Sequence, residues 1–86
     1  MANILVVEDD KDLNNAYKII LESENHVVVS AFNGKEALEA LQTFEPDLIL
    51  LDLLMPIMGG LEFLQHYDLQ KHHPKVKVLI FTRSEE

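Results

Sequence analysis

The strongest constraint on the fold of this sequence is an alternation of short apolar runs with longer amphipathic stretches. The runs are rich in Val, Ile and Leu and have the length of strands covered on both faces. The stretches between them place apolar residues at helical spacing. The expected strands are 3–7, 26–31, 47–51 and 75–82, and the expected helices are 11–23, 33–44 and 59–70. The order βαβαβαβ predicts an α/β fold with a doubly wound parallel sheet, right-handed crossovers and helices on both faces.

The expected helices each have an apolar stripe that we expect to face the core. The stripe residues are Leu13, Ala16, Tyr17, Ile20 and Leu21 in the first helix, Ala37, Leu38, Leu41 and Phe44 in the second, and Leu61, Leu64 and Tyr67 in the third. Asp9 or Asp10 is expected to cap the first helix, and Asn33–Gly34 to start the second. The aromatic residues are assigned to the core. The run 47–51 is so dense in leucine that we expect a central strand.

Composition limits the class of protein. With 86 residues the chain is long enough for one domain, residues 1–86. Seven Lys+Arg against 15 Asp+Glu give a formal charge of −8 without a basic stripe, which argues against nucleic-acid binding. No apolar run approaches the length of a membrane span, and we expect no membrane association. The absence of cysteine fits a cytoplasmic location. His66, His72 and His73 lack the spacing of metal ligands and are expected to be solvated.

One acidic residue lies in an apolar run, "LILLDLLMP" at 48–56, and others follow the first expected strand. A buried carboxylate needs a partner or a metal, so Asp52 requires an explanation. Ligands of open parallel sheets bind outside the carboxyl ends of the strands. If the first and third strands are neighbours, Glu8, Asp9 and Asp10 converge with Asp52, and the fourth strand brings Thr82 to the same rim. Clustered carboxylates favour hydrated Mg²⁺, although helix capping alone would explain Asp9 or Asp10.

Three segments together resemble one family. "ILVVEDD", "PDLILLDLLMPIMGGLEFL" and "VLIFT" are similar to the receiver domain of two-component response regulators. The most specific part is D-x-x-M-P at 52–56 with a glycine eight residues after the Asp. The resemblance implies a flavodoxin-like sheet with strand order 2-1-3-4. It also implies a signalling module rather than an enzyme, which receives a phosphoryl group from a sensor histidine kinase.

The resemblance assigns a role to each matching residue. Asp52 is expected to be the phospho-acceptor, and Thr82 the hydroxyl that turns toward the phosphoryl group. Glu8 and Asp9 are expected to bind Mg²⁺ together with Asp52 and the backbone carbonyl of Leu54. Pro56 and Gly60 are expected to shape the loop beside the acceptor.

The sequence also departs from the family pattern. Gly59 stands where an acidic residue is common, and Arg83 follows Thr82 where a small residue is usual. A receiver usually continues with a helix, a strand and a helix after this point, and the lysine that pairs with the phosphoryl group belongs to that part. We therefore expect a receiver truncated after its fourth strand, with weak Mg²⁺ binding and slow or absent phosphorylation.

One further expectation follows from a sheet that ends with the fourth strand. An apolar strand at the edge of a sheet pairs with other chains, so we expect self-association through that strand, by edge pairing or by swapping of elements between chains. The rival interpretation is a scaffold or interaction fragment, natural or engineered, which keeps the receiver fold without its chemistry. A phosphatase with an Asp nucleophile is less consistent, because such enzymes usually have a second Asp two residues later, where this chain has Leu54.

Overall fold

The computed structural model describes residues 1–53, 58–66 and 68–81. Its strands are β1 (Asn3–Val7), β2 (Val27–Ala31), β3 (Leu48–Asp52) and β4 (Lys77–Phe81). Its helices are α1 (Lys11–Ser23), α2 (Gly34–Ala40), α3 (Gly60–His66) and α4 (Leu69–His72). In the described residues, no helix is long and apolar enough to cross a membrane.

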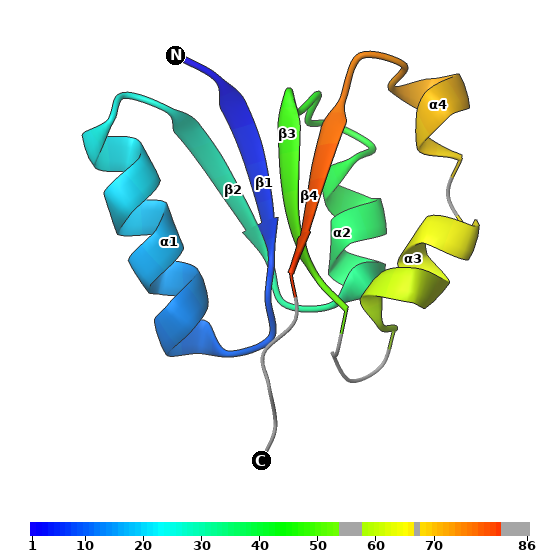
Figure 1. Ribbon diagram of the computed structural model, residues 1–86, viewed down its shortest axis with the longest axis horizontal. Coiled ribbons are helices and arrows are strands. Elements are labelled where there is room, and N and C mark those ends of the chain that lie inside the picture. The colour runs from blue at the N-terminus through cyan, green and yellow to red at the C-terminus, as the bar shows by residue number, and fades with distance from the viewer. Residues whose placement is uncertain (54–57, 67, 82–86) are drawn as a thin grey trace.

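The four strands form one parallel sheet in the order β2-β1-β3-β4, as the resemblance implied. Val6 pairs with Ser30 on one side and with Leu50 on the other, and Leu50 pairs in turn with Leu79. The dense β3 is an inner strand, as predicted from its composition. Because β1 and β3 are neighbours and run parallel, their carboxyl ends lie side by side at the same end of the sheet (Figure 1).

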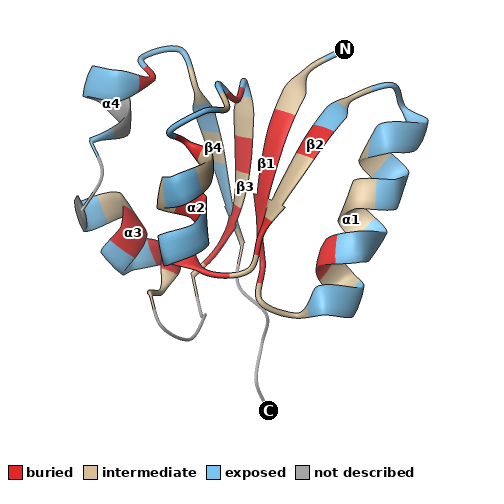
Figure 2. Cartoon of the chain, turned by 180° about the vertical axis from the view of Figure 1, so that it is seen from behind, coloured by how far each residue is buried: buried red, intermediate tan, exposed pale blue. Residues whose placement is uncertain are grey.

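The sheet has an apolar cluster on each face, and helices lie on both faces (Figures 1 and 2). Alternate residues of β1 belong to different clusters, as the two-residue period of a strand requires. Leu5 and Val7 pack in the larger cluster with α2 and the fully buried Phe63 of α3. Ile4 and Val6 pack in the smaller cluster under Tyr17 and Leu21 of α1. Strand β1 is thus buried on both faces, whereas Leu48 and Leu50 of β3 are only partly buried on the side of the smaller cluster.

Helix α1 buries a narrower stripe than its sequence predicted. Leu13, Tyr17 and Leu21 are partly buried, but Ala16 is exposed and Ile20 is 60% exposed. Helical geometry explains the correction, because Ala16 and Ile20 lie on the flank of α1 rather than on the side that packs against β1 and β2. Asn14, on the inner side, is buried in their place.

The second and third expected helices are shorter than predicted. Helix α2 ends at Ala40, and the amides of Gln42 and Thr43 then bond to carbonyls three residues back, which tightens the last turn before Pro46. The expected helix 59–70 is two helices. Asp68 starts the second, because its side chain accepts a hydrogen bond of 3.0 Å from the amide of Lys71, as a helix cap does.

Two more of the described residues, Leu61 and His73, differ in burial from what the sequence predicted. Leu61 faces solvent, and Phe63 takes the core position in α3. His73 is buried rather than solvated, and its Nδ1 lies 2.8 Å from Oε2 of the exposed Glu45. Of the aromatic residues assigned to the core, Phe63 alone is fully buried among those described, and Tyr67 lies outside the described residues. The apolar stripes therefore predicted which side of a helix faces the core better than they predicted how deeply each residue is buried.

Candidate metal centre

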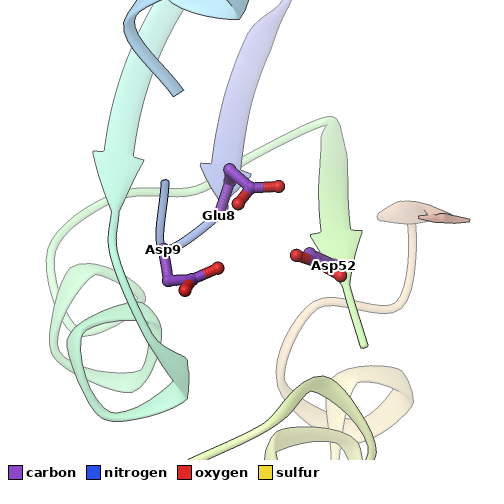
Figure 3. Close-up of side chains that lie close together, drawn as sticks. All are labelled: Glu8, Asp9 and Asp52. Carbon is purple, nitrogen blue, oxygen red and sulfur yellow. The ribbon is translucent and has the colours of Figure 1, made fainter. Parts of the chain in front are cut away.

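Three carboxylates meet where β1 and β3 end. Glu8 follows β1 directly, Asp9 follows Glu8, and Asp52 is the last residue of β3. One ligand oxygen from each lies within 4.8 Å of the others. Figure 3 shows the three side chains pointing toward a common space between the two strand ends. Glu8 and Asp52 are buried and Asp9 is partly exposed, so the cluster opens to solvent on the side of Asp9.

The three acidic residues after β1, Glu8, Asp9 and Asp10, differ in the contacts that they make. Oδ1 of Asp10 accepts hydrogen bonds from the amides of Asp12 and Leu13, at 3.0 and 3.1 Å, so Asp10 is the cap of α1. The amide of Asp10 donates to Oε2 of Glu8 at 2.9 Å and thereby orients that carboxylate. The cap that the sequence left open between Asp9 and Asp10 is therefore Asp10, and Asp9 faces the cluster.

Asn14 of α1 is hydrogen-bonded to this segment, a role that the sequence analysis missed. The side chain is 1% exposed, and its Nδ2 donates to the carbonyl of Glu8 at 2.9 Å and to that of Ala31 at 3.1 Å. The Glu8 amide also donates to the Ala31 carbonyl, at 3.0 Å. Asn14 thus joins the ends of β1 and β2. The sequence does contain a signal for the burial of Asn14. Asn14 precedes Tyr17 and Leu21 by three and seven residues and therefore lies on the same side of the helix.

The chain after Asp52 is held by two close backbone contacts. The amide of Gly60 donates to the carbonyl of Leu53 at 3.2 Å, and a Cβ at Gly60 would lie 2.7 Å from the carbonyl oxygen of Asp52. Gly34 is equally restricted, since its amide donates to the carbonyl of Met58 at 2.8 Å and its Cβ would lie 2.6 Å from Cγ of Met58. Glycine at these positions lets the starts of α2 and α3 approach the chain that follows β3.

Several expected site residues cannot be placed. Leu54, Pro56, Thr82 and Arg83 lie outside the described residues. Gly60, by contrast, lies beside Asp52 as expected. Of the expected metal ligands, the structure brings Glu8, Asp9 and Asp52 together.

The donor set is suited to one kind of ligand. Three carboxylates within 4.8 Å repel one another, and a small divalent cation removes that repulsion. Oxygen donors without nitrogen or sulfur favour hard cations, and Mg²⁺ is usually held by one or two carboxylates with water completing the shell. The partly exposed Asp9 leaves access for such water. The residues therefore fit Mg²⁺.

Comparisons with known proteins agree with this geometry. A family model described as the response regulator receiver domain matches residues 4–86. The chain is 39% identical over 59 residues to the chemotaxis protein CheY of Halobacterium salinarum, an alignment that covers 69% of this chain and 49% of that protein.

Two solved structures are similar over nearly the whole chain. The N-terminal domain of a response regulator receiver protein from Methanoculleus marisnigri superposes with a TM-score of 0.88 at 34% identity, covering 100% of this chain and 70% of that one. The response regulator TrrA from Thermotoga maritima, in complex with Mg(2+)-BeF, gives 0.83 at 32% identity and covers 99% and 72%. The chain thus spans about half of the halobacterial protein and about seven tenths of these structures.

Proposed function

This chain belongs to the receiver domain family of response regulators, and from that premise we propose that residues 1–86 act as a phospho-accepting signalling module with Asp52 as the acceptor. Receiver domains accept phosphate from sensor histidine kinases, and such a kinase is the proposed donor. The cytoplasm is the proposed place of transfer. The observation that supports the proposal most directly is the convergence of Glu8, Asp9 and Asp52 within 4.8 Å.

Each residue of the cluster has a separate role in the proposed chemistry. A carboxylate oxygen of Asp52 attacks the phosphorus of a phosphohistidine, the P–N bond breaks, and the leaving imidazole keeps the electron pair and takes a proton from water. The product is an aspartyl phosphate. Glu8 and Asp9 would hold Mg²⁺ with Asp52, and bound Mg²⁺ neutralises charge on the phosphoryl oxygens. The carbonyl of Leu54 as a further ligand and the hydroxyl of Thr82 as the switch group stay predictions from the resemblance.

Local geometry supports Asp52 as the nucleophile. It ends an inner strand and is 1% exposed, so its carboxylate is fixed by the sheet rather than by a loop. The close approach of Gly60 keeps the start of α3 against the Asp52 backbone. Glu8 is oriented by the Asp10 amide. A preorganised acceptor loses little entropy when the phosphodonor arrives.

The test is phosphorylation by a small donor. The chain is incubated with acetyl phosphate and Mg²⁺, and intact-mass spectrometry measures the addition of one phosphoryl group. We expect slow addition to the wild type and to Asp12→Asn, an exposed control, and none to Asp52→Asn or to the wild type without Mg²⁺. A label that persists in Asp52→Asn refutes the acceptor assignment. A folded wild type that is never labelled favours the scaffold alternative. The expected impairment of transfer stays a prediction, and the rate of this reaction measures it.

We also propose that the chain self-associates through β4. This strand is the outer one of the described sheet, and its Leu79 and Ile80 are 57% and 47% exposed. The amide of Lys77 and the carbonyl of Phe81 bond toward β3, so the backbone groups of Val78 and Ile80 face outward. Two β4 strands from two copies can pair antiparallel about a twofold axis. In that pairing Val78 lies opposite Ile80 of the partner subunit, and the two Leu79 residues lie opposite each other at the axis.

Sedimentation equilibrium tests this pairing. The wild type should be dimeric at high concentration, and Leu79→Glu should be monomeric because it places two like charges opposite each other at the twofold axis. Ile19→Glu is the matched control, since Ile19 is 59% exposed on α1 and lies outside β4. A monomeric wild type, or a dimer that Leu79→Glu leaves intact, contradicts the proposal.

A further inference from the structure

A groove of about 470 Å³ lies between α1 and the outer strand β2. Helix α1 lines it with Lys11, Asn15 and Lys18 among others, and the strand side contributes Val28, Ser30 and the following Phe32. None of the three clustered carboxylates lines this α1–β2 groove. The phosphoryl chemistry proposed for Asp52 therefore does not account for it.

The edge of β2 offers backbone groups to an additional strand. The amide of Val27 donates to the carbonyl of Ala2, and the carbonyl of Ala31 accepts from the amide of Glu8, so both residues bond toward β1. Because bonding direction alternates along a strand, the amides and carbonyls of Val28 and Ser30 face away from β1. In the described sheet β2 has no neighbour on that side. Such an edge is the usual template for pairing with an extended peptide.

The charge of the groove selects the peptide. Lys11 and Lys18 make no ion pair with a carboxylate among the described residues, although the whole chain has a formal charge of −8. Nζ of Lys11 lies 6.0 Å from the centre of the Phe32 ring, which places this ammonium at the groove. Two lysines seven positions apart on a helix are separated by about 10 Å along its axis. Carboxylates two or four residues apart on a strand, about 7 or 13 Å, are within reach of these flexible side chains.

The opposite face of β2 places a second requirement on the side chains of a bound peptide. Val27 is 44% exposed, and by the alternation of the strand its side chain lies on the face away from α1, as does that of the partly buried Val29. A strand added beside β2 would therefore present alternate side chains to two environments. One set would meet the lysines of α1, and the other would cover the exposed valine.

We propose that the α1–β2 groove binds an extended peptide segment of another protein with alternating acidic and apolar residues, which adds to the sheet as a strand next to β2. Its carboxylates contact Lys11 and Lys18, its apolar side chains cover Val27, and its backbone bonds to Val28 and Ser30. This binding requires neither Mg²⁺ nor Asp52.

The experiment titrates the ¹⁵N-labelled chain with an acetylated decapeptide of alternating Glu and Val, without Mg²⁺. We expect chemical-shift changes confined to residues 27–32 and to α1, with slowed hydrogen exchange at the amides of Val28 and Ser30. Lys11→Ala/Lys18→Ala should weaken binding at least tenfold. The matched control Lys35→Ala/Lys75→Ala removes two exposed lysines outside the groove and should bind like the wild type.

Two comparison ligands make the result decisive. A decapeptide of alternating Lys and Val should not bind, since it has the same apolar face and the opposite charge. Inorganic pyrophosphate tests a site for small anions. The proposal is overturned if the Glu-Val peptide causes no shifts at millimolar concentration, if the Lys-Val peptide binds equally well, or if pyrophosphate displaces the peptide at lower concentration than the peptide itself needs.

Discussion

Replacing Asp52 by Asn should stabilise the metal-free chain, although the change alters a buried residue. Asp52 is 1% exposed, and its ligand oxygen lies within 4.8 Å of those of Glu8 and Asp9. Asparagine has nearly the same shape and removes one of three like charges. Most substitutions at buried sites destabilise a protein, so an increase in stability would identify electrostatic repulsion as the dominant local effect.

The magnitude follows from Coulomb's law. At 4.8 Å two like charges repel by about 3 kcal/mol with an effective dielectric constant of about 20, which suits the buried Glu8, and by about 1 kcal/mol in water, which is closer to the partly exposed Asp9. Local relaxation and residual repulsion in the unfolded chain reduce both values. We expect a net gain of about 1–3 kcal/mol. In a domain of this size each kcal/mol raises the melting temperature by about 4–8 °C.

The assay is urea unfolding followed by far-UV circular dichroism, with chelator and with Mg²⁺. With chelator, Asp52→Asn should unfold at higher urea than the wild type. With Mg²⁺ the wild type should gain stability by mass action, and the variant should gain less because it lacks one carboxylate ligand. Glu39→Gln removes the same charge from an exposed position of α2 and should change stability by less than about 0.5 kcal/mol. A metal-free Asp52→Asn no more stable than Glu39→Gln would refute the reasoning.

Three other substitutions test the packing around the cluster, each measured by the same urea titration. Asn14→Ala removes two buried hydrogen bonds to backbone carbonyls and should cost about 2–4 kcal/mol, whereas the adjacent, exposed Asn15→Ala should cost less than about 0.5. Equal effects at the two positions would contradict the role of Asn14. Gly60→Ala should cost about 1–3 kcal/mol, because its Cβ would lie 2.7 Å from the Asp52 carbonyl oxygen, even though alanine favours helix; an unchanged midpoint would show that this approach can relax. Phe63→Ala should cost about 3–5 kcal/mol, and a smaller loss would mean that α3 collapses into the cavity.

Much of the fold could be predicted because its signals are local or topological. The apolar runs gave all four strands, with β1 correct to the residue and the others within two residues at each end among the described positions. The helix stripes were less informative. Ile20 has the spacing of a core residue, but its exposure depends on what packs beside the flank of α1. The buried His73 contacts Glu45, whose Oε2 lies 2.8 Å from its Nδ1, and Glu45 comes from a connection 28 positions earlier in the chain.

For the candidate site, the residue types and their positions at strand ends predicted an acidic, Mg²⁺-compatible centre once β1 and β3 were taken as neighbours, as the resemblance implied. Carboxyl ends of neighbouring parallel strands must lie together, and Glu8, Asp9 and Asp52 have no other place in such a sheet. Long-range packing decided the rest. It assigned the helix cap to Asp10 and left Asp9 for the cluster, and it buried Asn14 against two strand ends while exposing Asn15. Two adjacent residues of the same type differ here only in the direction that α1 turns them, and that direction is fixed by the sheet on which the helix packs.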